Sequence, residues 1–230
     1  MVTKVSDAMR VTTALDATKL TGNLPAISGA SLTSLTAGNL TGNLPAISGA
    51  SLTGLPASGG LITLASTTIS TPVAAVAFNS TYINSTYDNY KVVFHGLAPS
   101  ADNQDLGLLM SVDNGSSFAT HVGGHMAHLL SGTATYYTGS TSYITFGVDE
   151  ESSTDGNVSG YLDIFGVNST TQFKFATGQC LVKNQDGTYY YYTIYGYIGS
   201  TTAVNYVKVF TSVGGNLATG TVTLYGYAKS

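Results

Sequence analysis

The sequence predicts an all-β protein made of three successive parts. Short segments with the two-residue period of β-strands, separated by turn residues, fill the chain from residue 61. No segment of this region has the period of an amphipathic helix. A letter-for-letter repeat before residue 60 separates an N-terminal shaft from this β-rich head. The predicted parts are an anchoring segment (1–15), a repeat shaft with its neck (16–60), and a C-terminal head (61–230).

The composition is that of a neutral, folded β-protein. Charged residues make up 9% of the 230 residues and hydrophobic residues 43%, which argues against disorder. The formal net charge of -4 argues against nucleic-acid binding, which requires a basic face. No apolar run reaches the length of about twenty residues that a membrane span needs, so no membrane insertion is expected. The single cysteine, Cys180, cannot form an intrachain disulfide and is expected to be a small buried hydrophobe.

The first fifteen residues are expected to form a short anchor that attaches the chain to a larger assembly. They carry Lys4 and Arg10 and a weak helical pattern in Val5, Met9 and Val11. A disordered start is the alternative. The segment lacks the apolar middle of a signal peptide, which indicates a protein made and kept in a cytoplasm before assembly.

The shaft is predicted from a repeat of LTGNLPAISGASLT, which begins at Leu20 and again at Leu40. Glycine and proline inside each copy would break a helix, and the spacing of the apolar residues fits neither a helix nor a strand. A solenoid needs about three repeats to bury a continuous core, whereas this chain has two. The economical solution is an intertwined homotrimer in which each copy contributes the same apolar side chains to a common axis: Leu20, Leu24, Ile27, Leu32, Leu35, Leu40, Leu44, Ile47, Leu52 and Leu55.

The head is predicted to be a jelly-roll-like β-sandwich, because about ten short strands follow one another with turn signals between them. Good hairpin turns are expected at Asp113–Gly115, Asp155–Gly156, Asp186–Gly187 and Gly214–Gly215. The predicted strands cover 61–67, 73–78, 90–96, 106–112, 134–137, 142–148, 157–165, 172–182, 188–198, 205–212 and 219–227.

The predicted strand 188–198 has two apolar faces. One face carries Tyr190, Tyr192 and Ile194, and the other carries four tyrosines, namely Tyr189, Tyr191, Tyr195 and Tyr197. A strand with one wet face would place polar residues at alternate positions. The second face is therefore predicted to be a subunit interface or a receptor face, with an ordinary core position as the remaining alternative.

Three histidines within eight residues are weak candidates for a metal site. His121, His125 and His128 have spacings that imidazole ligands of zinc can use. The glycines between them and the missing glutamate exclude the helical zinc-protease motif. The ordinary interpretation is a group of exposed loop histidines, so no metal or other cofactor is expected.

Acidic residues give no support for catalysis. Asp149, Glu150 and Glu151 form one acidic cluster with Asp155, and a solvated loop between strands is favoured over a calcium site, because the spacing does not match an EF-hand. Asp163 is the only carboxylate at the centre of a predicted strand and is expected to accept a hydrogen bond. A glycosidase needs two carboxylates at a fixed separation across a cleft. The protein is therefore expected not to be an enzyme.

Four segments resemble fibre proteins of tailed bacteriophages. The repeat segment 20–56 looks like the short repeats of such fibres, and YDNYKVVF (87–94) with LLMSVDNG (108–115) is similar to the opening of their C-terminal domains. The ending GTVTLYGY (220–227) is similar to their closing strand. The resemblance implies a homotrimeric virion fibre with an outward-facing head.

The expected function is therefore that of a structural fibre protein on the virion surface, made in the cytoplasm of the bacterial host. Its partners would be two further copies, other virion proteins through the N-terminus, and a host cell-surface glycan or protein. Attachment would gain strength from avidity, because three weak sites are held together. The alternatives are a capsid-decorating head fibre with an accessory adhesive role, a small capsular polysaccharide depolymerase, and a non-viral adhesin or lectin head.

Overall fold

The computed structural model describes residues 60–130, 135–150, 158–184, 187–212 and 214–229. The chain divides into two compact units, Met1–Gly54 and Leu55–Ser230, and every described residue belongs to the second. The predicted anchoring segment and the repeat residues from Leu20 to Leu55 lie outside the described residues. The described part contains no helix long and apolar enough to cross a membrane.

Twelve strands account for the regular structure of the described residues. They follow one another along the chain as β1 (Leu61–Ile69), β2 (Ala75–Phe78), β3 (Tyr90–Pro99), β4 (Gln104–Ser111), β5 (His121–Leu129), β6 (Thr135–Ser140), β7 (Ile144–Glu150), β8 (Val158–Phe165), β9 (Lys174–Lys183), β10 (Tyr189–Ile198), β11 (Tyr206–Thr211) and β12 (Leu217–Tyr227).

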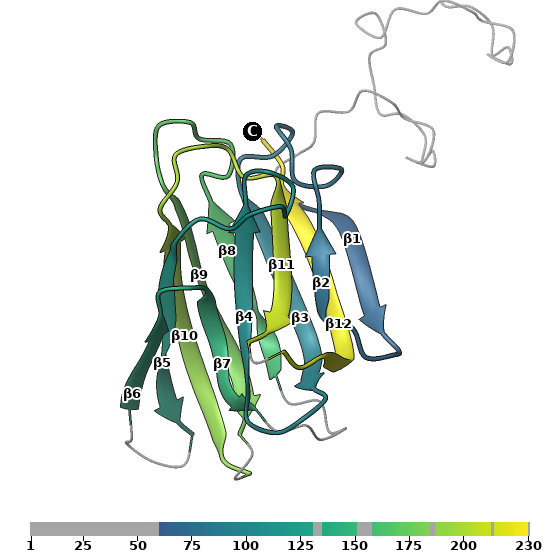
Figure 1. Ribbon diagram of the computed structural model, residues 1–230, viewed down its shortest axis with the longest axis vertical. Coiled ribbons are helices and arrows are strands. Elements are labelled where there is room, and N and C mark those ends of the chain that lie inside the picture. Colours follow the sequence, from purple (N-terminus) through teal and green to yellow (C-terminus); the bar gives the residue numbers. More distant parts are fainter. Residues whose placement is uncertain (1–59, 131–134, 151–157, 185–186, 213, 230) are drawn as a thin grey trace, which may run out of the picture. The chain divides into compact units, whose positions relative to one another are not determined.

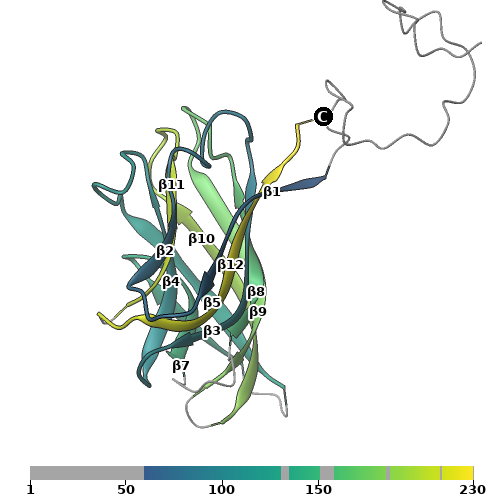
Figure 2. The same ribbon diagram turned by 90° about the vertical axis from the view of Figure 1, so that its right-hand side faces the viewer.

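The strands form two antiparallel sheets that face each other as two layers (Figures 1 and 2). The larger sheet has the order β1-β12-β3-β8-β9-β10-β5-β6, and the smaller has the order β2-β11-β4-β7. The chain passes from one sheet to the other at β1–β2, β2–β3, β3–β4 and β4–β5, and again from β6 to β8 and from β10 to β12. The prediction of an all-β head is confirmed, in the form of two antiparallel sheets.

The core lies between the two sheets and is almost entirely apolar. Phe94 of the larger sheet stacks on Phe146 of the smaller, with ring centroids 4.7 Å apart. Both are fully buried, as are Tyr90, Leu108 and Ile194. Each such side chain stabilises the fold by about 1.5–3 kcal/mol through its removal from water. Cys180 is also buried, as expected, and its thiol donates to the carbonyl of Phe146.

The two ends of the sandwich are distinguished by the residues and connections that lie there. Gly60 and Ala228 lie side by side at one end, where the amide of Ala228 donates to the carbonyl of Gly60 at 2.9 Å. The connections β2–β3, β4–β5, β8–β9 and β10–β11 lie at this end, which we call the Gly60 end. Strands β1, β3, β5, β7, β9 and β11 end at the opposite end, and β2, β4, β6, β8, β10 and β12 begin there (Figure 1).

The predicted strands agree with the structure except in one place. All eleven have counterparts among the observed strands, whereas β5 falls in a region expected to be a loop. Of the predicted hairpin turns, Asp186–Gly187 does connect the paired strands β9 and β10. The hairpin predictions at Asp113–Gly115 and Gly214–Gly215 were wrong, because these segments carry the chain between the two sheets. Asp155–Gly156 lies outside the described residues.

Candidate functional site

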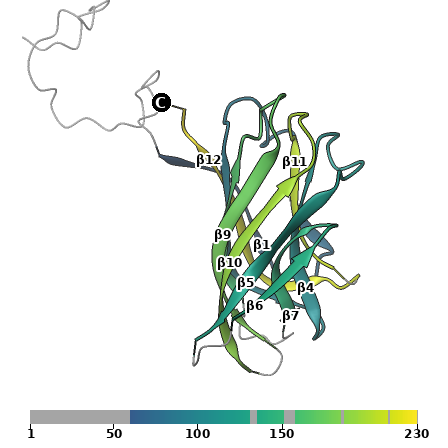
Figure 3. The same cartoon turned by 90° about the vertical axis from the view of Figure 1, so that its left-hand side faces the viewer.

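An apolar face covers one side of the larger sheet, on the side away from the core. It comprises the outward residues of β8, β9, β10 and β5, together with Phe173 and Leu130, which continue β9 and β5; we call it the aromatic face. Figure 3 shows β9, β10 and β5 side by side on this side of the molecule. The strand order fixes which outward residues are neighbours, because each antiparallel pair sets a register.

The densest part of the aromatic face is a row that runs across four strands close to the Gly60 end. Phe165 of β8 pairs with Phe175 of β9, Phe175 with Tyr197 of β10, and Tyr197 with Val122 of β5. Phe173 adds a ring that stacks on Tyr197, with centroids 6.0 Å apart and planes only 5° from parallel. Phe175 is nevertheless 54% exposed, although an aromatic ring of this size gains most from burial.

A shallow apolar hollow opens beside this row. Phe175, Tyr195 and Tyr197 stand around it, and its floor is the backbone of Gly123 and Gly196. The two glycines pair across β5 and β10, and a Cβ built on Gly196 would lie 2.7 Å from Cγ1 of Ile144 on the inner side. A larger residue at this position would therefore clash with the smaller sheet. The close packing leaves a depression that an apolar side chain can enter.

The four tyrosines predicted to form a functional face all lie on the aromatic face. Tyr189 and Tyr195 are 56% and 38% exposed, whereas Tyr191 and Tyr197 are half-buried. Tyr192, on the opposite side of the same strand, is fully buried in the core. The structure thus brings the four tyrosines together on the outer side of the sheet, as the two-residue period predicts.

Several apolar residues of this face were not predicted as site residues. They flank the tyrosines on the neighbouring strands: Phe165, Phe173, Phe175, Leu181, Met126 and Leu130. The segment from Phe175 to Val182 does alternate in burial along β9. The sequence, however, carries no signal that places β9 between β8 and β10. Only the strand order shows that these residues and the tyrosines form one surface.

His121 and His125 lie on the inner side of β5 and are fully buried, so the expectation of exposed loop histidines was wrong. The Nδ1 of His121 lies 2.7 Å from the carbonyl oxygen of Ala119, and its Nε2 accepts a hydrogen bond of 2.8 Å from the amide of Met110. This pattern requires a neutral ring with the proton on Nδ1. Burial lowers the pKa of His121, which also favours the neutral ring.

His125 stacks face to face on Tyr192, with ring centroids 4.0 Å apart. Its burial lowers its pKa to about 4, and the backbone of Thr145 opposes this shift. His128 points to the other side of β5, because it lies three positions after His125 and successive residues of a strand alternate between its faces. The three histidines therefore do not converge. Among the described residues, no group of three histidine, cysteine or acidic side chains is placed to hold a metal ion.

Asp163 is held by two partners on the outer side of the larger sheet. The Nζ of Lys91 lies 2.8 Å from Oδ1 of Asp163, and the hydroxyl of Tyr227 donates to the same carboxylate at 2.5 Å. Burial, followed by this hydrogen bond, raises the pKa of Tyr227. The same ammonium lies 3.6 Å from the ring centre of Tyr161, a cation–π contact. The expected hydrogen bond to Asp163 is present.

The other predicted acidic residues add little to this picture. Asp149 and Glu150 belong to strand β7, so the cluster starts in a strand and not, as expected, in a loop. Glu151 and Asp155 lie outside the described residues.

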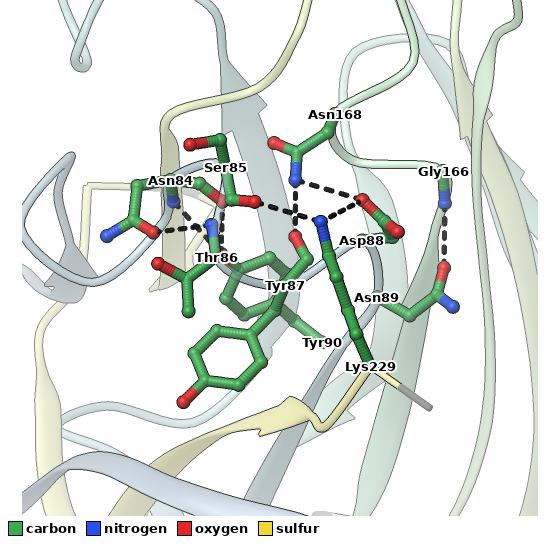
Figure 4. A network of polar contacts seen from close by, with 10 residues as sticks. All are labelled: Asn84, Ser85, Thr86, Tyr87, Asp88, Asn89, Tyr90, Gly166, Asn168 and Lys229. Atoms are coloured by element: carbon green, nitrogen blue, oxygen red, sulfur yellow. Dashed lines mark hydrogen bonds and ion pairs between the residues drawn. The ribbon is translucent and has the colours of Figure 1, made fainter. Parts of the chain in front are cut away.

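Polar contacts tie the C-terminal residues to the loop between β2 and β3 at the Gly60 end. Figure 4 shows the ammonium of Lys229 between the carbonyl of Ser85 and the carboxylate of Asp88, each at 3.0 Å. Asn168 donates from the β8–β9 loop to the carbonyl of Tyr87 at 2.5 Å. Asn168 also donates to Oδ1 of Asp88 at 3.3 Å, and the hydrogen bonds that Asp88 accepts from Lys229 and Asn168 lower its pKa. The arrangement fixes three segments together at this end.

A buried lysine fixes two further loops at the Gly60 end. Lys174 is fully buried, and its ammonium donates to four backbone carbonyls at 2.6 to 3.3 Å, those of Ser169, Gln172, Ser200 and Thr201. Its burial lowers its pKa. Since the four carbonyls belong to the β8–β9 and β10–β11 loops, the lysine acts as a cationic cross-link between them. The Gly60 end is therefore held together by a dense set of polar contacts.

Comparison with known proteins finds no matching family model, no matching curated protein and no matching solved structure. The geometry of the described head is therefore the basis for a functional proposal. It includes an exposed apolar face on the outer side of the larger sheet.

Proposed function

We propose that this protein is a homotrimeric fibre that attaches a virion to the surface of a host cell through its C-terminal head. The observation that carries this proposal is the position of Gly60 and Ala228 at one end of the sandwich. A shaft joined at Gly60 leaves the strand ends at the opposite end, with the described β1–β2 and β3–β4 loops, far from the point of attachment. Loops on a rigid scaffold are the usual place for recognition.

The strand order supports a jelly-roll-like head. Four strands in the order β1-β12-β3-β8 face four in the order β2-β11-β4-β7, and β9, β10, β5 and β6 extend the first set. Jelly rolls are common in capsid and lectin domains. In this proposal, the four extending strands are the part of the head that distinguishes it from a minimal eight-stranded sandwich.

The N-terminal part supplies the remaining elements of the proposal. The two repeats between Leu20 and Leu55 form the trimeric shaft, and residues 1–15 attach it to other virion proteins, as the resemblance to tailed-bacteriophage fibres implies. Three heads on one shaft bind a repetitive host glycan or protein by avidity, so that each site needs only modest affinity. The head contributes binding and no catalytic step.

The first test is the mass of the purified full chain in solution, measured by light scattering. We expect three times 23.7 kDa. A mass of 23.7 kDa would overturn the fibre proposal, because a single copy has no partner with which to bury its repeat leucines.

A second test asks which end of the head binds. A four-residue Gly-Ser insertion within 100–103, in the β3–β4 loop at the opposite end, should weaken attachment of the labelled trimer to bacterial cells. The same insertion within 79–82, in the β2–β3 loop at the Gly60 end, is the matched control and should bind like the parent. If the control insertion alone abolishes attachment, the proposed orientation of the head is wrong.

A further inference from the structure

We propose that the aromatic face is the surface through which the three heads pack against one another. This inference rests on the proposed function, since it assumes that three copies share one shaft. It goes beyond that function by assigning the contact surface to β8, β9, β10 and β5 and by leaving the loops of the opposite end free. A second copy of this chain is the occupant that the following observations favour.

The exposed apolar area has the size of a protein interface. Eight large apolar side chains of this face are each between 38% and 58% exposed: Phe165, Phe173, Phe175, Leu181, Tyr189, Tyr195, Met126 and Leu130. At about 200 Å² for each fully exposed side chain, they offer roughly 700–800 Å². A standard interface buries about 800 Å² on each partner.

The face also lacks the charges that would oppose its packing against an identical surface. Along the outward positions of β8, β9, β10 and β5, the only Asp, Glu, Lys or Arg residues are Asp163 on β8 and Lys183 at the end of β9, and the one histidine is His128 on β5. Asp163 is already paired with Lys91. Charge depletion with enrichment in aromatic residues is the composition of an interface core.

The lining of the hollow favours an apolar side chain over a sugar. Val122, Phe175 and Tyr195 dominate its walls, and the hydroxyl of Thr177 is already committed to the carbonyl of Ile194 at 3.0 Å. A glycan site would need several side chains free to bind ring hydroxyls. A leucine or an aromatic ring of a neighbouring head needs only the apolar walls.

The position of the densest row agrees with a shared shaft. Phe165, Phe175 and Tyr197 lie close to the Gly60 end, where the chain arrives from the repeat segment. Heads that meet through this row approach one another nearest to the proposed shaft. The loops of the opposite end then remain exposed in all three copies, as attachment requires.

Cysteine labelling of the full chain tests the inference directly. The native Cys180 is buried, so a Phe175→Cys variant carries one thiol on the aromatic face that is exposed in a single head. Ala77→Cys is the matched control, because Ala77 is exposed on the smaller sheet, away from this face. We expect a maleimide to react with the Phe175→Cys protein at least tenfold more slowly than with the Ala77→Cys protein, and equally fast after unfolding.

The mass of each variant, measured on the same sample, separates this inference from the proposed function. A trimer in which position 175 reacts as fast as position 77 overturns the shared interface and leaves the fibre in place. A monomer overturns both, whether position 175 is reactive or is protected by another segment of the same chain. A trimer with a protected position 175 and a reactive position 77 supports the inference.

Discussion

Acidification should destabilise the head through His125, because burial makes this imidazole bind a proton less tightly in the folded chain than in the unfolded chain. Above pH 6.5 the ring is neutral in both the folded and the unfolded chain, so it makes no pH-dependent contribution. Below pH 6.5, His125 binds a proton in the unfolded chain. In the folded chain it stays neutral until the pH approaches its lowered pKa of about 4. The free energy of unfolding therefore falls as the pH decreases through this window.

The size of the effect follows from the two pKa values. Each tenfold difference in proton affinity corresponds to about 1.4 kcal/mol, so the fall from 6.5 to about 4 corresponds to a loss of roughly 3 kcal/mol near pH 4. A His125→Phe variant keeps an aromatic ring against Tyr192, which His125 contacts at a centroid distance of 4.0 Å. It should be as stable as the parent at pH 7 and more stable than the parent at pH 4.

Urea unfolding from pH 7.5 to pH 4, followed by circular dichroism at fixed protein concentration, measures this difference. The lowered pKa of His121 remains in the variant, so the pH dependence should shrink and not disappear. His95→Gln removes an exposed imidazole from β3 and serves as the matched control. If the parent and the His125→Phe variant lose the same stability on acidification, the reasoning about His125 is refuted.

Three further predictions concern other parts of the chain. Lys174→Met should lower the free energy of unfolding by about 2–4 kcal/mol, because four carbonyls lose their shared donor; an unchanged melting temperature would contradict this role. Gly196→Ala should cost about 1–3 kcal/mol through its clash with Ile144. Adding Ile144→Ala should give a double variant less destabilised than the sum of the single variants in urea unfolding. Leu24→Asp combined with Leu44→Asp should reduce the mass measured by light scattering while the circular dichroism of the head stays the same; an unchanged trimer would place the source of oligomerisation in the head.

The strands were predictable wherever apolar and polar residues alternate along the sequence. Strand β5 shows where this signal fails. The segment from His121 to Leu129 has two central glycines and only one β-branched residue, so nothing local favours a strand. It is a strand because Gly123 fits opposite Gly196 and beneath Ile144, a tertiary requirement that no local pattern contains. The burial of the histidines was missed for the same reason, because it follows from the position of β5 in the sheet.

The conformation of the turns was predictable from the sequence, but the strands that the turns connect were not. Asn114 and Gly115 do have positive φ values of 58° and 87°, as their residue types favour. A turn of this kind, however, does not specify whether the next strand pairs with the previous one or crosses to the other sheet. For the site, the period of β10 was sufficient to place its tyrosines on one face. The strand order was needed to show that Phe175 and Leu181 lie on the same face as these tyrosines.

The position of β12 has a consequence for how the chain is made. This eleven-residue strand lies between β1 and β3, and it pairs Tyr227 with Leu61. The larger sheet is therefore completed only when its last-synthesised strand is in place. While the ribosome is still adding residues before Leu217, β1 has no partner and one edge of β3 is open, and open edges invite pairing with other chains. Pairings between such distant residues also form slowly. Nascent chains are thus most at risk of aggregation before β12 has been made, and conditions that slow translation extend that period.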